Sequence, residues 1–463
     1  MVTLVHPAVR LGAIVAMLWA AGCGSTARES QPNPEPGDDP PQPPNAVRYP
    51  GYGFVVHEWG TDTIVVGSDG SMQRGLHHEE EDLPAFVYDR MSAGTLPGST
   101  SINVDVKMET PVTYFYSDEP RTVEVAVDFP KGVFTQWYPA VKSFYPLIMG
   151  PNVGPNHPEA ADPVLDPTFP FSSQTCIDKY GFVGNGLLQW GTVDVLPRGE
   201  RPALPDAPLD RFSWSFAREV DSNDLRVQGV PGAEAPEAER FLFYRGLGNF
   251  ELPAKITAAA GGHLTVQNSF GDPVRGVFVL NVGADKAAFR YLPEGVPAGG
   301  SIEAEAPALD GGEPIDAYIE SLGAEVTKAL DGTGLYHDEA VAMVNTWKRQ
   351  WFATPGLRLL YLAPQSWTDA SIPLSVEPKP NATVRVMVIR VEVITPELEE
   401  LDAVAAHKLG GADAAEGEAH FLSLGRFAEP RLRRATSLIG ETAASQELLS
   451  SITTADTRVA AGE

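Results

Sequence analysis

Residues 53–70 read GFVVHEWGTDTIVVGSDG and place two apolar runs on either side of a polar centre. The runs 54–59 and 63–70 are rich in β-branched and aromatic residues, which predicts two strands. Between them, Gly60-Thr61-Asp62 favours a turn. Each predicted strand needs hydrogen-bonding neighbours from elsewhere in the chain.

Strand signals continue through the first two thirds of the sequence. Residues 122–129 alternate cleanly, with valines and a phenylalanine on one face and mostly polar residues on the other, which predicts a half-buried strand. Further strands are predicted at 112–117, 132–138, 186–195, 212–217, 240–245, 263–269, 275–281 and 301–305. Short strands between Gly, Pro and Asp turns favour a β-rich body over 49–312, either a sandwich or barrel-like.

The pattern changes near residue 313. Residues 314–330 and 336–353 have helical periodicity, and Val341, Val344, Trp347 and Trp351 recur on one face of the second segment. Strands are predicted at 357–364 and 384–394, and a helix is predicted to begin at Pro396. The expected fold class is α+β, with an α/β portion at 313–440 packed on the β-rich body. Residues 441–463 are expected to form a loose tail.

The first 22 residues have the layout of a secretory signal peptide. An apolar run, Leu11–Ala21, is about half the length that a membrane-spanning helix needs. It ends in Ala20-Ala21-Gly22-Cys23, which resembles the lipobox of bacterial lipoproteins, a family in which the cysteine is lipidated and becomes the new N-terminus. The alternative is an ordinary cleaved signal with an incidental cysteine. A lipidated Cys23 would leave Cys176 without an intrachain partner.

Residues 23–48 support export to the cell envelope. This segment is rich in proline and almost free of apolar side chains, so we expect a disordered tether between the lipidated cysteine and the body. The predicted location is therefore outside the cytoplasm, anchored by lipid, with the outer membrane or the periplasmic face favoured.

Composition excludes several kinds of partner. The chain has 463 residues and a formal net charge of −27, which argues against nucleic acid because phosphate binding needs a basic face. The sequence contains no Walker A motif and no GxGxxG, so no nucleotide is expected. The absence of GxSxG and CxxC lowers the case for a serine hydrolase or a thiol redox enzyme.

His57 and Glu58 are the first candidates for a functional site. Neighbouring side chains of a strand point to opposite faces, so the two share a site only if a bulge or turn follows at once. A zincin motif fails because position 61 is threonine rather than histidine. Buried polar groups need partners, so structural hydrogen bonding is the first interpretation, and a metal or catalytic site is the second.

Residues 77–84 read HHEEEDLP and hold two histidines beside four acids. His77 and His78 could bind a divalent metal together with His57 and a carboxylate, although adjacent ligands on one loop seldom complete a coordination shell. A solvated run of charge is the alternative interpretation. No cofactor other than this divalent metal is expected.

Four further residues are candidates for ligand binding. Trp137 and Tyr138 stand before a proline and could stack on a sugar, although such aromatic residues more often hold loops to a core. Arg90 and Arg245 could each recognise an anionic group through two hydrogen bonds, with structural salt bridges as the alternative.

Glu58 and Glu109 are the catalytic candidates, since glycosidases use a pair of carboxyl groups.

Several segments together resemble a known group of sequences. They are FVVHEWGT, LPAFVYDR, KMETPVTYFY, FPKGVFTQWYP, FLFYRGLGNFELP, EAVAMVNTWKRQWF and RVEVITPE. The chain resembles uncharacterised exported bacterial proteins marked by a His-Glu-Trp-Gly-Thr segment, over about residues 50–430. The resemblance implies that the β-rich and helical parts belong together, and it implies no activity.

These observations lead to two functional hypotheses. The first is a lipid-anchored cell-envelope protein that binds a glycan or another envelope protein, or has a structural role. The alternative is a metal-dependent hydrolase that uses His57 with His77 or His78 and a carboxylate.

Overall fold

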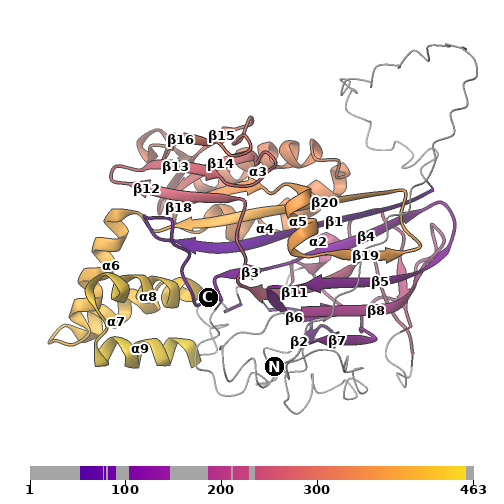
Figure 1. Ribbon diagram of the computed structural model, residues 1–463, viewed down its shortest axis with the longest axis horizontal. Helices are drawn as coiled ribbons and strands as arrows, with labels where there is room; N and C mark the ends of the chain where they lie inside the picture. The colour runs from indigo at the N-terminus through magenta and orange to yellow at the C-terminus, as the bar shows by residue number, and fades with distance from the viewer. Residues whose placement is uncertain are drawn as a thin grey trace, which may run out of the picture. The chain divides into compact units, whose positions relative to one another are not determined.

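A large mixed sheet runs through the computed structural model (Figure 1). The structure describes residues 53–76, 78–79, 82–89, 104–145, 186–209, 212–228 and 235–454. Cys23, His77, Arg90 and the predicted tether lie outside these residues.

The large sheet has 11 strands in the order β17-β15-β14-β18-β20-β1-β3-β11-β6-β2, with β4 paired to both β1 and β11. Its strands are β1 (Phe54–Val66), β2 (Tyr88–Asp89), β3 (Val106–Met108), β4 (Val112–Ser117), β6 (Gly132–Tyr138), β11 (Leu242–Gly248), β14 (Arg275–Val282), β15 (Lys286–Leu292), β17 (Glu313–Pro314), β18 (Gly356–Leu362) and β20 (Ala382–Val393).

Two smaller sheets accompany it. One has six strands in the order β10-β9-β8-β5-β19, with β7 paired to β8, and the other has three in the order β12-β13-β16. Their strands are β5 (Arg121–Phe129), β7 (Ser143–Tyr145), β8 (Gly186–Val195), β9 (Leu225–Val227), β10 (Glu237–Glu239), β19 (Leu374–Glu377), β12 (Ala254–Ala259), β13 (His263–Asn268) and β16 (Ser301–Glu305).

Most of the described helices come late in the chain. They are α2 (Trp214–Ala217), α3 (Ile315–Asp331), α4 (His337–Ala353), α5 (Gln365–Ser371), α6 (Pro396–Lys408), α7 (Ala414–Leu422), α8 (Ala428–Ile439) and α9 (Ala443–Thr454), with the 3-10 turns η1 (Leu309–Gly311) and η2 (Gly425–Phe427). None of these helices is both long enough and apolar enough to span a membrane. The fold class is α+β and β-rich, as the sequence predicts.

β1 lies in the interior of the large sheet, and it is one continuous strand where the sequence predicts two. It is continuous from Phe54 to Val66 and buried along its whole length, so the predicted turn at Gly60–Asp62 is wrong. It pairs in parallel with β20 on one side and antiparallel with β4 and then β3 on the other. Gly60 permits close packing rather than a turn, because a β-carbon there would lie 2.8 Å from Met387 Sδ and 2.9 Å from Pro111 Cα.

The sheet does not stop at residue 313, where the sequence pattern changes. β18 and β20 come from the C-terminal third of the chain, and they lie between β14 and β1 in the same sheet. The α/β portion therefore supplies two interior strands of the β-rich body, rather than forming a layer packed on its outside.

The structure confirms one local prediction and contradicts two others. In β5 the predicted inward face is buried and most of the other face is exposed, which confirms the alternation. Residues 214–217 form the short helix α2, so the strand predicted at 212–217 is wrong. Residues 443–454 form α9 with Leu448 and Ile452 buried, so this part of the predicted loose tail is wrong too.

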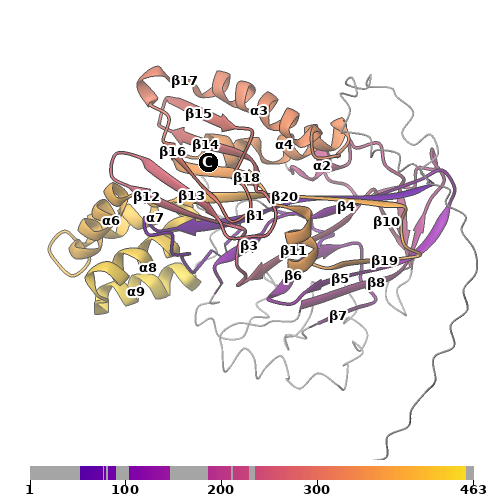
Figure 2. The ribbon, with the colours of Figure 1, turned by 45° about the horizontal axis from the view of Figure 1, so that its top comes forward.

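The helices α6–α9 gather at one end of β1 and β20, while α3 and α4 cover a face of the sheet (Figures 1 and 2). The helical group has its own small apolar core, separate from the main one. Its buried members are Ala405, Ala406, Leu409, Phe421, Ala428, Leu432, Ala435, Leu448 and Ile452.

Candidate functional site

Alternate residues of β1 face opposite sides of the large sheet, and this separates the two residues of the His-Glu pair. His57 is paired with Tyr114 of β4 and Val384 of β20, and Glu58 is paired with Thr113 and Arg385. Their surroundings are different, so each residue has to be interpreted on its own.

His57 joins β1 to the start of α4. The ring is buried, and its Nδ1 lies 2.8 Å from Glu339 Oε2. Tyr336 stacks on the ring with 4.6 Å between centroids, and the hydroxyl of Tyr116 donates to Glu339 Oε1 at 2.7 Å. Glu339 also caps its helix, since Oε2 accepts the backbone N–H of Tyr336 at 2.6 Å. The imidazole is therefore part of a helix-capping network.

Glu58 lies at the centre of a second network on the opposite face. Its Oε1 accepts hydrogen bonds from Tyr244 at 2.6 Å and Thr113 at 2.9 Å, and its Oε2 accepts one from Arg385 Nε at 2.7 Å. Arg385 Nη1 also reaches Asp369 at 2.9 Å. Burial opposes the charged form of Arg385, but the carboxylate of Glu58 outweighs it and raises the pKa of the guanidinium. Glu58 is fully occupied as the counter-ion of a buried arginine.

The structure does not bring His57 and His78 together. Lys107 Nζ donates to the backbone oxygen of His78 at 2.5 Å, and Lys107 is paired with Thr63 on β1. Thr63 is six positions along the strand from His57, and such a separation is about 20 Å in an extended chain. No group of three or more His, Cys, Asp or Glu side chains suited to a metal occurs among the described residues. The metal site predicted from His57 and His78 is therefore not assembled there, and His77 lies outside the described residues.

Five side chains form what we call the ionic cluster: the buried Lys107, Glu109, Arg245 and Arg426, and the half-buried Glu79. Lys107 Nζ lies 3.0 Å from Glu79 Oε2, and Arg426 Nη1 lies 2.7 Å from Glu109 Oε1. Arg245 bonds the backbone oxygen of Glu109 through Nε at 2.5 Å and contacts Glu79 through Nη1. The cluster lies at the end of β3, where η2 approaches the sheet.

The electrostatics of Glu109 follow from this cluster. Burial raises the pKa of its carboxyl, but Arg426 and then Lys107 and Arg245 outweigh burial, so the pKa falls to about 2. Glu58 and Glu109 thus each have their own cationic partner in separate networks. The structure does not present them as a facing pair with an open space between their carboxyl groups.

Arg245 and the aromatic candidates are buried rather than available. Arg245 is 1% exposed and is engaged in the ionic cluster. Trp137 is 1% exposed and stacks on Tyr88 at 6.1 Å, and Tyr138 is 4% exposed and lies 4.7 Å from Phe86. The interpretation of Trp137 and Tyr138 as surface platforms for a sugar is wrong, because they belong to β6 and pack into the core. Arg90 lies outside the described residues.

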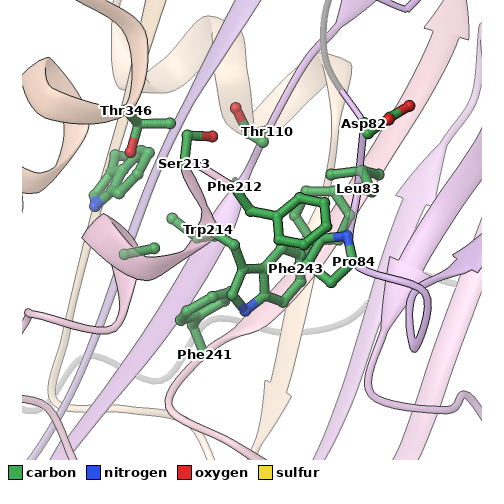
Figure 3. A pocket seen from close by; sticks show the side chains of 13 residues that line it. Asp82, Leu83, Pro84, Thr110, Phe212, Ser213, Trp214, Phe241, Phe243 and Thr346 are labelled. Carbon is green, nitrogen blue, oxygen red and sulfur yellow. The ribbon is translucent and has the colours of Figure 1, made fainter. Parts of the chain in front are cut away.

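A small pocket that the sequence did not indicate lies on the same face of the sheet as His57. We call it the aromatic pocket, and Figure 3 shows Phe212 and Trp214 approaching it from one segment of the chain and Thr110 from another. It encloses about 20 Å³, room for about one water molecule. Its lining is Trp59, Asp82, Leu83, Pro84, Thr110, Val112, Phe212, Ser213, Trp214, Ala217, Phe241, Phe243 and Thr346.

Two polar atoms of this lining have no partner. Trp59 Nε1 and Thr110 Oγ1 are buried and make no hydrogen bond within the part of the chain that the structure describes. By contrast, the indole N–H of Trp214 donates to Glu239 Oε2 at 3.1 Å. Of the lining residues, Asp82 is exposed and Leu83 and Ser213 are half-buried, so these three mark the mouth.

The sequence holds a partial signal for this pocket. Trp59, Phe241 and Phe243 lie in or beside predicted strands, and an alternating aromatic pair predicts one shared face. The pattern around Trp214 predicts a strand, whereas residues 214–217 form the helix α2. The sequence therefore does not place Trp214 beside the other aromatic residues of the pocket. Convergence of six separate segments on one point depends on the tertiary fold.

Comparisons with known proteins identify no family for the chain. No family model matches it, and no curated protein matches it. Among solved structures, it is similar to the Fcho1 Mu homology domain of Danio rerio with a bound Eps15 peptide, at 8% identity over 74% of this chain and 96% of that chain. The TM-score of 0.26 is too low to support any argument about fold or function, so the site has to be interpreted from its own geometry.

Proposed function

We propose that this chain is a lipid-anchored protein of the bacterial cell envelope that acts by binding a partner rather than by catalysis. The predicted order is a signal peptide, a lipidated Cys23, a proline-rich tether and the folded body. Two acyl chains anchor a protein stably, because each buried methylene contributes about 0.8 kcal/mol.

The geometry of β1 is the observation that carries the choice of binding over catalysis. His57 and Glu58 point away from each other into separate buried networks, and each is engaged by side chains of the core. Catalytic groups need access to a reacting atom, and neither side chain lines the aromatic pocket. The aromatic pocket is lined by mostly buried apolar side chains and has room for about one water molecule.

The anchor is tested by metabolic labelling with a fatty acid that carries an alkyne. The full-length chain is expected to take up the label and to sediment with membranes, and Cys23→Ala is expected to lose both properties. Cys176→Ala is the matched control, since the chain has 2 cysteines, and it should be labelled like the unaltered chain. Labelling that persists in Cys23→Ala would contradict the proposal.

The binding role is tested with the purified full-length chain as bait for solubilised envelope proteins and for isolated cell-wall glycan. We expect a specific protein or glycan to be retained. Retention of neither, at concentrations at which the chain is folded, would count against a binding function.

A further inference from the structure

We propose that the helices α6–α9 open from the large sheet as one body, with the buried ion pair between Arg426 and Glu109 as the latch. Opening uncovers Lys107, which is fully buried in the closed structure. Neither the anchor nor a binding partner is needed for this movement. Three features of the structure support it: the separate core of these helices, the nature of their contacts with the sheet, and a single chain connection.

The helices have an apolar core of their own. Phe421, Leu432 and Ala435 are fully buried in it, and the main core includes no described residue of α6–α9. Among the described elements, α6–α9 approach one another closely but meet the strands only at isolated residues. Two parts of a chain whose interface is neither large nor hydrophobic are expected to move relative to each other. The apolar cluster between them is small and consists of Val65, Leu76 and Ile394, with Leu398 and Phe427 partly buried against them.

Further contacts between the helices and the sheet are polar and come from turns. Ser68, just after β1, donates from its backbone N and its Oγ to the two carboxylate oxygens of Glu399 on α6, at 2.9 and 2.8 Å. Gly261, between β12 and β13, donates from its backbone N to Glu397 Oε1 at 2.9 Å. These bonds lie at least partly in solvent, so water replaces them when the helices move away.

The ion pair that we call the latch is buried. Arg426 Nη1 lies 2.7 Å from Glu109 Oε1, and the two side chains are only 4% and 2% exposed. Arg426 belongs to η2, between α7 and α8, and Glu109 directly follows β3. Removing one partner of such a pair leaves a buried charge uncompensated, and opening relieves this by admitting water. Loss of either partner therefore favours the open state.

One short connection serves as the hinge. Within the described chain, the backbone passes from the sheet to α6–α9 only at Ile394-Thr395-Pro396. The backbone N of Ile394 still donates to Val66 O at 2.8 Å, and Thr395 already caps α6. Rotation about this connection moves the helices without breaking the sheet or the helical core.

Lys107 is a chemical reporter of opening. Its Nζ lies 3.0 Å from Glu79 Oε2 with no exposed side-chain surface, so an amine-acylating reagent does not reach it in the closed state. In the full-length chain, we expect Arg426→Met to raise the rate of Lys107 acylation about a hundredfold, as for loss of one partner of a buried ion pair. Glu109→Gln is a second latch variant with the same expected direction. Peptide mass spectrometry measures the rate, with the exposed Lys286 as the internal reference.

A second reporter distinguishes movement of the whole body from local loosening around η2. The amide of Ser68 bonds to α6, so its hydrogen exchange should become faster together with Lys107 acylation. Exchange at Leu432, inside α8, should stay unchanged, because an opening body keeps its own core. Arg433→Met is the matched control, since Arg433 pairs with Glu429 on its own helix, and it should leave both reporters unchanged.

Urea provides a test on the unaltered chain, should circular dichroism show that both latch variants fail to fold. Opening exposes much less surface than unfolding, so Lys107 acylation should become only slightly faster with urea below the unfolding transition. A dependence as steep as that of global unfolding would overturn the inference. Unchanged Lys107 acylation in folded latch variants would do the same, as would faster acylation without faster exchange at Ser68, or with faster exchange at Leu432.

Discussion

Asp62 is a carboxyl group that the fold buries without a hydrogen bond from any described residue. It lies in the middle of β1, where the sequence predicts a solvated turn. Burial, and then the nearby charge of Glu109, raises the pKa of Asp62 to about 8. Asp62 is therefore protonated in the folded state at neutral pH and below.

This shift determines how stability depends on pH. In the unfolded chain an aspartate ionises above about pH 4. Between that value and the folded-state pKa of about 8, the folded state holds one more proton than the unfolded state. The contribution of Asp62 to the free energy of unfolding therefore falls as pH rises through this window, by up to about 1.4 kcal/mol per pH unit.

Asp62→Asn should remove this contribution. We expect the variant to be more stable than the unaltered chain at pH 7, with a difference that shrinks as the pH approaches 4, because asparagine cannot ionise. Urea unfolding at a series of pH values measures both effects. Asp285→Asn is the control, since Asp285 is exposed. Parallel pH profiles for Asp62→Asn and the unaltered chain would contradict the assignment.

At the residue scale, the sequence correctly predicts the faces to which neighbouring side chains of one strand point. The opposite orientation of His57 and Glu58 follows from strand alternation, and the structure confirms it, along with the expectation that each has a partner. The sequence does not predict which residues are the partners, because Glu339 and Arg385 lie 282 and 327 positions away along the chain. Nothing local in the sequence encodes such pairs.

At the scale of elements, β1 shows how packing overrides a local turn signal. Gly60 reads as a turn residue, but in the structure it lets β1 approach Met387 and Pro111 closely. The strand stays extended because β20 on one side and β4 and then β3 on the other satisfy its backbone groups.

Gly60→Ala tests the interpretation that Gly60 allows close packing within an unbroken β1. The added methyl would meet Met387 Sδ at 2.8 Å and the backbone of Pro111 at 2.9 Å, and overpacking of this kind costs about 1–3 kcal/mol. Urea unfolding should show a loss in that range. Gly271→Ala is the control because its β-carbon meets nothing within 4 Å. Equal stabilities of the two variants would favour a loose turn at residue 60.

The helices α6–α9 form an element-scale unit with their own core. Leu432 is fully buried in that core, while Leu438 on the same helix is 48% exposed. Arg426 ties the segment before α8 to Glu109 at 2.7 Å, so the unit is also held to the sheet by a buried ion pair.

Leu432→Ala should destabilise this unit more than the sheet. A buried leucine cut back to alanine costs about 2–5 kcal/mol. Hydrogen exchange followed by mass spectrometry should show faster exchange in α6–α9 and little change in β1. Leu438→Ala should change exchange little, because its side chain is already half in solvent. Uniformly faster exchange in β1 and in the helices would show that the two unfold together.

At the scale of the whole molecule, the large sheet joins the two ends of the described chain. β1 pairs in parallel with β20 over Val55–Val66, and β18 lies next to β20. The described residues after Arg48 belong to one compact unit. The change of pattern near residue 313 marks a change in local structure and leaves the sheet unbroken.

A fragment of residues 49–312 should therefore fail to fold. It lacks β18 and β20, so β14 loses its link to β1 and long strand edges become exposed. We expect aggregation on size-exclusion chromatography and no near-ultraviolet circular dichroism. A fragment of residues 48–454 keeps every described element and should behave like the full chain. A monomeric, cooperatively folded 49–312 fragment would show that the break at 313 is a true domain boundary.

The sequence by itself determined the fold class and the periodicity of most elements. The strands at 112–117, 132–138, 186–195 and 301–305 and the helices from about 315 and 337 follow from patterns within a few residues. The anchor and tether are likewise local patterns, and they remain predictions. Tertiary structure alone decided that β1 is unbroken, that Trp137 and Arg245 are buried, and that an aromatic pocket forms beside Trp59. The reason is that burial and partner choice depend on which distant segments meet, and here β1 obtains its neighbours from the opposite end of the chain.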